Sequence, residues 1–198
     1  MTSSAEGRRS AGGREGVHRA ALCLIAQHGV SGTSLQMIAD SMGVTKAAVY
    51  HHYKTKDEIV LGIVAPSLDR LTAVVTAAEA EPDHAARVSA VVTGLVDSLL
   101  ADRVAYGVLQ GDPAVVQLFT RHPPLQALMR RVRALMTGPD PDDATRTAVA
   151  MLAAGLRGAA TDPLCADLDD AALRPHLLAA ARRVLAGCQA QLPAPATG

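Results

Sequence analysis

Apolar side chains recur along most of this chain at intervals of three and four residues, which is the spacing of one face of an α-helix. The first such face comprises Val17, Ala21, Leu24 and His28, and Gly29 follows it as a helix stop. Similar stripes continue towards the C-terminus, separated by Pro, Gly and Asp. The pattern therefore predicts an all-α protein of about nine helices.

Capping signals divide the N-terminal region into short helices. Thr33 and Gln36 have the spacing of a capping box, in which both side chains satisfy free backbone amides at a helix start. The helix that begins there is expected to end at Gly43, which suits a left-handed turn. Thr45 then caps a third short helix over residues 46–53. Two short helices joined by a turn containing Gly predict a helix-turn-helix.

The rest of the chain shows helical signals only. A second capping box at residues 55–58 opens a long helix to about Ala78. Pro66 lies within this helix and crowds the carbonyl of Gly62, so we expect a kink there. The helix near residue 141 is expected to carry Pro141 as its first residue, with acidic residues in its first turn. The later helices are predicted over residues 83–100, 102–110, 113–121, 124–136, 141–160 and about 171–190.

Composition agrees with a globular helical protein. The hydrophobic share is 49%, Ala and Leu dominate, and there is no Trp and one Phe among 198 residues. No apolar run reaches the roughly 18 residues that cross a bilayer, and the N-terminus lacks the apolar core of a signal peptide. Cys23, Cys165 and Cys188 are odd in number and widely spaced, which disfavours a disulfide framework or a zinc site. We therefore expect a cytoplasmic protein without a metal.

Charge is unevenly distributed, although the chain is neutral as a whole. Residues 1–56 carry seven basic and three acidic side chains, a net charge of +4, and the remainder carries −4. All three lysines lie between positions 46 and 56. A basic N-terminal region on an acidic remainder favours contact with nucleic acid, although three lysines are few enough to cluster by chance.

One string of residues in the N-terminal region combines the two caps, the glycine turn and the tyrosines at fixed spacing. It comprises Ala21, Leu24, Gly29, Thr33, Ser34, Leu35, Ile38, Ala39, Gly43, Val44, Thr45, Val49, Tyr50, Tyr53, Lys56, Asp57 and Ile59. In these residues the chain resembles the tetracycline-repressor (TetR) family of bacterial regulators. The family commonly has Leu at the position of Val49 and Phe at that of Tyr53, and both departures are mild. The last two thirds of the chain match the family only in the number and rhythm of helices.

The short helix after Thr45 is the predicted DNA-recognition helix. Recognition helices contact bases with their N-terminal residues, so Lys46 could reach guanine, and Ala47 lets the backbone approach the major groove. Packing remains the better interpretation of Tyr53, and a solvated surface remains open for the histidines at 51 and 52. Together with the positions that the resemblance assigns to phosphate contacts, the predicted DNA-binding residues are Thr33, Ser34, Thr45, Lys46, Ala47, Tyr50, His51 and Lys56.

The C-terminal helices are predicted to form a homodimer and to bind a small lipophilic effector. In the resembling family the last two helices pair across the dimer, and small residues there permit close packing. The alternative for both sets of residues is the core of a single chain. The predicted dimer residues are Leu152, Gly155, Leu156, Leu177, Ala181, Val184, Leu185 and Cys188, and the predicted effector-lining residues are Tyr106, Phe119, Met129 and Met151.

These expectations define a transcriptional regulator, with a repressor released from a palindromic DNA operator as the specific hypothesis. An enzyme is disfavoured because the catalytic and phosphate-binding motifs GxSxG and HExxH and a Gly-rich loop are absent, and no cofactor is expected. An all-helical module that binds small molecules or proteins without regulating DNA is the alternative. The predicted domains are a flexible basic arm (1–14), a helix-turn-helix domain (15–57), a ligand-binding and dimerisation domain (58–190) and a disordered tail (191–198).

Overall fold

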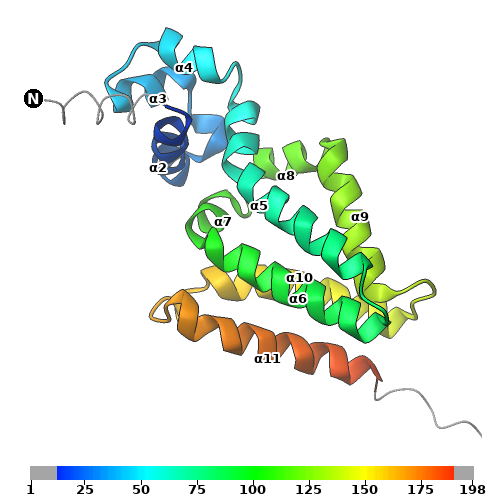
Figure 1. The fold of residues 1–198 in the computed structure, drawn as a ribbon. Coiled ribbons are helices and arrows are strands. Elements are labelled where there is room, and N and C mark those ends of the chain that lie inside the picture. The colour runs from blue at the N-terminus through cyan, green and yellow to red at the C-terminus, as the bar shows by residue number, and fades with distance from the viewer. Residues whose placement is uncertain (1–12, 190–198) are drawn as a thin grey trace, which may run out of the picture. The chain divides into compact units, whose positions relative to one another are not determined.

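The computed structural model describes residues 13–189, and every regular element in that range is helical (Figure 1). The predicted all-α fold class is confirmed. Most of the predicted arm and the whole predicted tail lie outside the described residues. The helices are α2 (Arg14–Gly32), α3 (Leu35–Met42), α4 (Lys46–His52), α5 (Lys56–Glu79), α6 (His84–Ala101), α7 (Arg103–Leu109), α8 (Pro113–Thr120), α9 (Pro123–Thr137), α10 (Asp143–Thr161) and α11 (Asp170–Gln189), with a 3-10 helix η1 (Pro163–Cys165).

The chain folds into two compact units, each made from two separate stretches of sequence. The first unit, which we call the head, comprises residues 13–66 and 104–123 of the described range. The second, the body, comprises residues 67–103 and 124–189. The division within α5 falls at Pro66, and the helix continues through it. Compactness does not assign function, so the functional boundary after residue 57 stays a prediction.

Aspartate caps fix where several helices begin. Asp83, Asp112 and Asp142 are the N-caps of α6, α8 and α10, and each carboxylate accepts a hydrogen bond from a backbone amide of the first turn. The prediction that Pro141 is the first residue of its helix is wrong. Because Asp142 provides the cap, the helix begins at Asp143 and the proline lies outside it.

The capping box predicted at Thr33 does not form, and the N-cap lies one residue later. Ser34 is the N-cap of α3, and its Oγ accepts a backbone amide hydrogen bond at 3.1 Å. Thr33 is buried, and its hydroxyl donates to the carbonyl of Gly29 at 2.8 Å. Gln36 does not return to the cap and instead donates to Asp40 at 2.7 Å. A buried hydroxyl needs a partner, and the bend before Thr33 offers a carbonyl within reach.

Helix α2 bends where its stop was predicted. Gly29 has φ 68° and ψ 170°, a conformation that favours glycine, and helical geometry resumes for the last residues of α2. The predicted apolar face is correct in its first half, but His28 is exposed. Cys23 is also exposed, because it lies between the positions that face the core. The buried residues of α2 are Val17, Ala21, Ile25 and Val30.

A single apolar core holds the head together. Helices α2, α3 and α4 contribute to it, as does the first part of α5. Leu109 and Val115 belong to the same core, although they come from a stretch that the sequence separates from the N-terminal helices by residues 67–103. The helix-turn-helix of this chain is therefore packed partly by α7 and α8.

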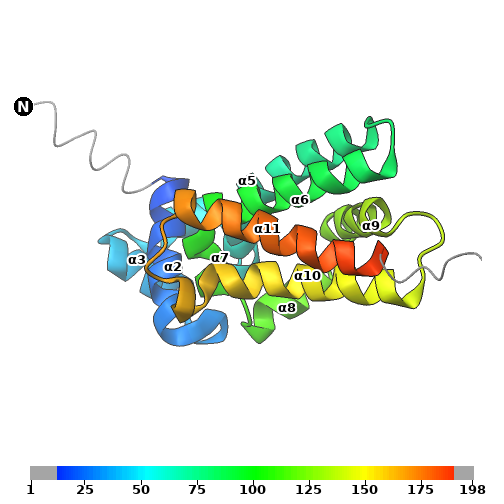
Figure 2. The same cartoon turned by 90° about the horizontal axis from the view of Figure 1, so that it is seen from below.

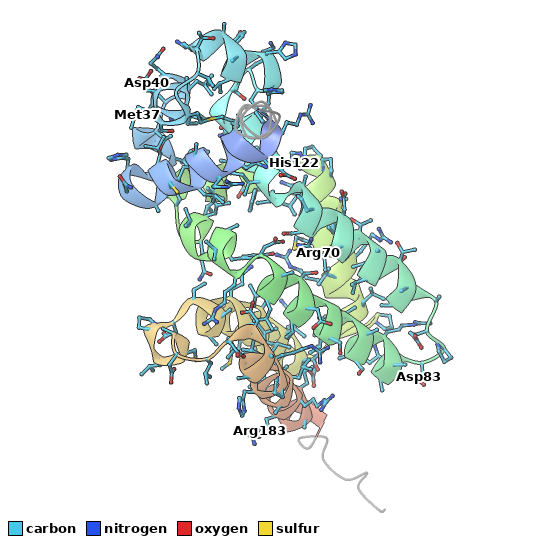
Figure 3. The ribbon with its side chains drawn as sticks, turned by 60° about the vertical axis from the view of Figure 1, so that its left-hand side comes forward. Met37, Asp40, Arg70, Asp83, His122 and Arg183 are labelled. Atoms are coloured by element: carbon cyan, nitrogen blue, oxygen red, sulfur yellow. The ribbon has the colours of Figure 1, made fainter. Side chains whose placement is uncertain are left out.

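The body is built on α10 and α11, which run side by side with α6 packed against both (Figures 1 and 2). Ion pairs join helices at its surface: Arg174 pairs with Asp97 at 2.6 Å, which ties α11 to α6. Asp83 marks the turn between α5 and α6, and Arg183 lies on an exposed side of α11 (Figure 3). The buried residues of the three packed helices include Val91, Val96, Leu99, Leu152, Leu156, Leu173, Leu177 and Ala181.

Helix α5 is long and apolar enough to cross a membrane by length and composition, with a mean hydropathy of 1.6 over its most apolar window. It is a core helix. Leu71, Val75 and Ala78 are buried at helical spacing on one face, and its first turn carries Asp57 and Glu58.

Candidate nucleic-acid interface

A tight turn joins α3 to α4, and local residues set its geometry. Gly43 ends α3 with φ 65° and ψ 30°, in the left-handed region that favours glycine. Thr45 caps α4, and its Oγ1 accepts a hydrogen bond from the amide of Ala48 at 3.2 Å. The turn and the cap predicted from the sequence are both confirmed. The two helices are thus fixed relative to each other by short-range contacts.

Helix α4 exposes most of its surface. Val49 is 1% exposed and fastens the helix to the head core, while the outward-facing side chains are short or polar. Ala47 and Ala48 let the backbone of α4 approach a partner closely. The outward face is therefore suited to insertion into a polar groove wide enough for a helix, such as the major groove of DNA. Its exposed members are Thr45, Lys46, Ala47, Ala48, Tyr50 and His51.

Lys54 extends this face, and the sequence reasoning did not select it. Its Nζ lies 4.4 Å from the centroid of the Tyr50 ring and donates to the Tyr50 carbonyl at 2.7 Å. The contact holds a cation beside the aromatic ring at the end of α4. The signal was available, since Lys54 lies four residues after Tyr50, but it falls just beyond the recognition helix.

Tyr53 anchors the end of α4 to the head, as the packing interpretation expected. It is 6% exposed, and its Oη lies 2.5 Å from Nε2 of His18 on α2. A Cβ atom at Gly62 would lie 2.8 Å from both of these atoms, so this glycine leaves room for the pair. Burial raises the pKa of Tyr53, and the Arg14 charge opposes that rise only in part. The tyrosine therefore stays protonated and holds α4 against α2.

The contact between His18 and Tyr53 is expected to make head stability depend on pH. Burial lowers the pKa of His18 below 6.5, the Arg14 charge lowers it further, and Glu15 opposes them. The folded head thus binds this proton more weakly than the unfolded chain. The resulting stability is fully present above about pH 6.5 and is lost as pH falls towards the folded pKa.

Thermal unfolding of the wild-type protein and His18→Gln, followed by circular dichroism between about pH 7.5 and 5.5, measures this effect. The difference in melting temperature between the two proteins should shrink as the solution is acidified. Parallel curves over the whole range would contradict the assignment.

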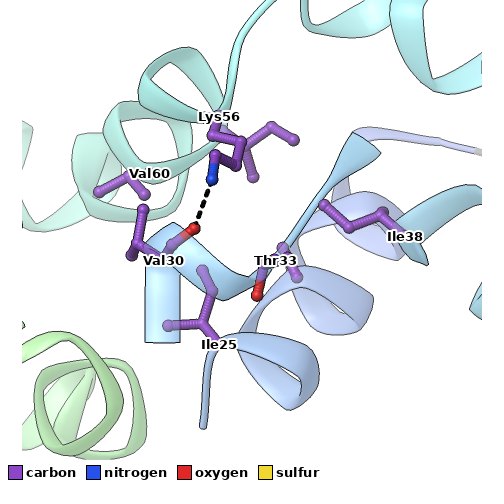
Figure 4. A pocket seen from close by; sticks show the side chains of 8 residues that line it. Ile25, Val30, Thr33, Ile38, Lys56 and Val60 are labelled. Carbon is purple, nitrogen blue, oxygen red and sulfur yellow. Dashed lines mark hydrogen bonds between the residues drawn. The ribbon is translucent and has the colours of Figure 1, made fainter. Parts of the chain in front are cut away.

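Two of the predicted DNA-binding residues face the head interior. Thr33 is 3% exposed, and the Nζ of Lys56 donates to the carbonyl of Val30 at 2.6 Å (Figure 4). The same ammonium donates to the carbonyl of Ser31 at 3.1 Å. Thr33 and Lys56 both line a pocket with room for about one water molecule, which is too small for an effector. Their geometry favours a structural role. A DNA contact by either residue stays a prediction.

The predicted effector-lining residues are not brought together within one unit. Tyr106 and Phe119 belong to the head, where Phe119 packs against the apolar core. Met129 and Met151 belong to the body, and Met151 is 64% exposed on α10. Their role in binding an effector stays a prediction. Among the described residues, no group of three or more His, Cys, Asp or Glu side chains is placed to hold a metal ion.

The predicted dimer residues divide into buried and accessible sets. Leu152, Leu156, Leu177 and Ala181 are buried in the core of the body itself. Gly155 is exposed, with open space where a Cβ would stand. The two residues near the end of α11, Val184 and Leu185, are half-buried, and the side chain of Cys188 lies outside the described part of the chain.

Helices α3 and α4 are both short and capped, and a left-handed glycine joins them. The exposed face of α4 carries short side chains. These features define a helix-turn-helix of the DNA-binding class. The family model described as "Bacterial regulatory proteins, tetR family" matches residues 18–63, which include α3 and α4. Residues 18–63 therefore carry the DNA-binding region of TetR-family transcriptional regulators, as the resemblance implied, and the protein is similar to regulators rather than to enzymes.

Relatives place the remainder of the chain in the same fold. The HTH-type transcriptional repressor KstR2 of Mycolicibacterium smegmatis is 33% identical over 58 residues, which are 29% of this chain and only 28% of that protein. KstR2 of Mycobacterium tuberculosis, named a ketosteroid transcriptional regulator, has a TM-score of 0.66 at 19% identity, covering 88% of this chain and 93% of its own. The Streptomyces coelicolor regulator SCO3833 has a TM-score of 0.65 at 21% identity, covering 86% and 90%. At these identities the two structures establish the fold alone.

Proposed function

We propose that this protein binds a specific double-stranded DNA operator through α4 and regulates transcription from it. The observation that carries the proposal is the exposed face of α4, which presents small and polar side chains while Val49 and Tyr53 hold the helix to the head. Lys46 lies at the N-terminal end of α4, where recognition helices contact base edges. Its ammonium can bond guanine O6 and N7, which discriminates bases by about 1–3 kcal/mol.

The proposed phosphate contacts lie on either side of Lys46 in the sequence. Tyr50 and His51 are exposed on α4, and Lys54 adds a cation next to Tyr50. Ser34 is exposed at the start of α3, whose free backbone amides favour a phosphate. We propose these four residues as the backbone contacts, with Thr33 and Lys56 supporting them from inside the head.

Selection of bound sequences from random duplex DNA tests this function. A symmetric, two-fold repeated site whose affinity falls steeply with salt supports a dimeric regulator. Binding without sequence preference would instead favour the alternative of an all-helical module that binds a small molecule or a protein.

The protein acts as a homodimer in this proposal, because a single helix-turn-helix buries little DNA surface. The predicted leucines are buried within the body, so we propose that the dimer contact lies on the outer face of α10 instead. Met151 and Gly155 lie four residues apart there, and Ala154 lies on the same side. An exposed methionine beside small residues permits two copies of α10 to approach closely.

Met151→Glu is expected to weaken the dimer at least about tenfold, because the interface would have to bury an unpaired charge. The monomer should remain folded, since Met151 is 64% exposed. Sedimentation velocity across a range of protein concentrations measures the dissociation constant. Leu164→Glu is the matched control, because Leu164 is an apolar body residue that is 89% exposed on η1, which follows the end of α10 and lies outside its proposed contact face. Equal dimer constants for the two variants would place the interface elsewhere.

A small lipophilic effector is the proposed signal, and release from the operator is its proposed effect. The name of the M. tuberculosis relative includes ketosteroids, which are lipophilic small molecules, and this supports the class of ligand without identifying it. Effector and operator must then weaken each other's binding by the same factor. We propose that the effector acts through α5, whose Pro66 lies where the head ends and the body begins. A cytoplasmic location follows from this function.

A further inference from the structure

The link between α2 and α3 leads directly into the helix-turn-helix and is held from outside it. Gly29 breaks α2 with φ 68°, and the next residue, Val30, is 3% exposed. The amide of Val30 donates to Oδ2 of Asp112 at 2.8 Å, and its carbonyl accepts from the Lys56 ammonium at 2.6 Å. Both backbone groups of one buried residue thus find partners in side chains from later helices.

The two carboxylate oxygens of Asp112 accept hydrogen bonds from different parts of the head. Oδ1 caps α8, accepting from the amides of Ala114 at 2.8 Å and Val115 at 3.4 Å, while Oδ2 accepts from Val30. Burial alone would raise the pKa of Asp112. The three amide hydrogen bonds and the Lys56 charge outweigh burial and hold that pKa below its ordinary value, so the group is a carboxylate at neutral pH.

The fit between Asp112 and the α2–α3 link is close. A Cβ atom at Gly29 would lie 3.3 Å from Oδ2, which is tighter than ordinary contact. Val115 on α8 is 4% exposed in the same core as Val30 and Ile38 of α3. Polar and apolar contacts therefore hold the N-terminal end of α8 against the start of the helix-turn-helix.

We propose that Asp112 is a positioning residue for DNA recognition, which sets the placement of the α2–α3 link and through it the exposed start of α3. The inference rests on the proposed function. It extends the DNA-binding structure beyond the N-terminal helices to α8, in a stretch that the chain reaches only after part of the body. In this proposal Asp112 accepts hydrogen bonds within the head and does not itself contact DNA. Its loss should therefore change how well a folded head binds DNA, and not only how stably the head folds.

Asp112→Asn separates the two tasks of this side chain. Its amide oxygen can keep capping α8, since Asn is as good an N-cap as Asp. Its NH₂ group would then replace Oδ2 and set one donor against another at the Val30 amide. We expect affinity for the selected DNA site to fall about tenfold, or about 1.4 kcal/mol. The slope of log affinity against log salt should become shallower by roughly one phosphate contact.

The experiment compares DNA affinity, its salt dependence and the circular dichroism melting curve for the full-length wild-type protein, Asp112→Asn, Asp112→Ala and Asp142→Asn. Asp142→Asn is the matched control, because Asp142 caps α10 in the body through Oδ1. It should keep wild-type affinity.

A loss of affinity by Asp112→Asn while the protein remains folded, with the control unaffected, supports the inference. Wild-type affinity and salt slope for Asp112→Asn, with loss only for Asp112→Ala, would overturn it and leave a capping role. A wild-type protein without sequence preference would overturn the proposed function and this inference together.

Discussion

Ala47→Glu is expected to abolish specific DNA binding while leaving the fold intact. Ala47 is exposed near the start of α4, so the longer side chain meets solvent in the free protein. In the proposed complex, a carboxylate would enter the major groove between two chains of phosphates. We expect affinity for the selected site to fall at least about a hundredfold, or about 2.8 kcal/mol.

Fluorescence anisotropy with the selected duplex measures this loss, and circular dichroism checks the melting temperature. Ala26→Glu is the matched control, since it places the same charge on an exposed position of α2 in the same unit. The control should lose far less affinity. If the two variants bind alike, α4 is not the recognition helix.

Gly94→Ala is expected to have the largest effect on stability. A Cβ at Gly94 on α6 would lie 2.3 and 2.4 Å from the two Cγ atoms of Val74 on α5, and 2.9 Å from its Cβ. Rotating the valine moves the Cγ atoms but not the Cβ, so the helix backbones must separate. Overpacking of this kind costs about 1–3 kcal/mol, and it outweighs the gain of up to about 1 kcal/mol from replacing Gly by Ala in a helix.

Chemical denaturation of both proteins measures this loss. The free energy of unfolding of Gly94→Ala should be about 2 kcal/mol below that of the wild type, with a correspondingly lower denaturation midpoint. Val74→Ala in the same chain should recover part of the loss, because it removes both Cγ atoms from the contact. Additive effects of the two substitutions would show that α5 and α6 do not meet at this point.

The helix-turn-helix was predictable because its determinants act over a few residues. Thr45 caps an amide three residues on, and Gly43 ends α3 through its own backbone conformation. Such signals need no knowledge of the rest of the fold. The error at Thr33 shows their limit. Thr33 and Ser34 are both capping residues, and only the bend at Gly29 decides which one faces the core.

Local spacing could not predict the contacts of side chains whose partners are distant in sequence. Lys56 has the position of a phosphate contact in the family, yet its partner is a carbonyl 26 residues away. Asp112 reads as an ordinary cap, and its second partner is 82 residues away. Cys23 lies among the apolar residues of α2, but it falls between the positions that face the core, and its thiol is exposed.

The sequence by itself determined the helices, the glycine turn and the small polar face of α4, because each depends on neighbours within one or two turns. The tertiary structure decided which apolar residues the body buries and which it exposes, since Leu152 and Met151 are adjacent and both apolar, yet only Leu152 is buried. It also decided that α8 completes the head. Both outcomes depend on which helices pack together, and that is a property of the whole chain that no local spacing encodes.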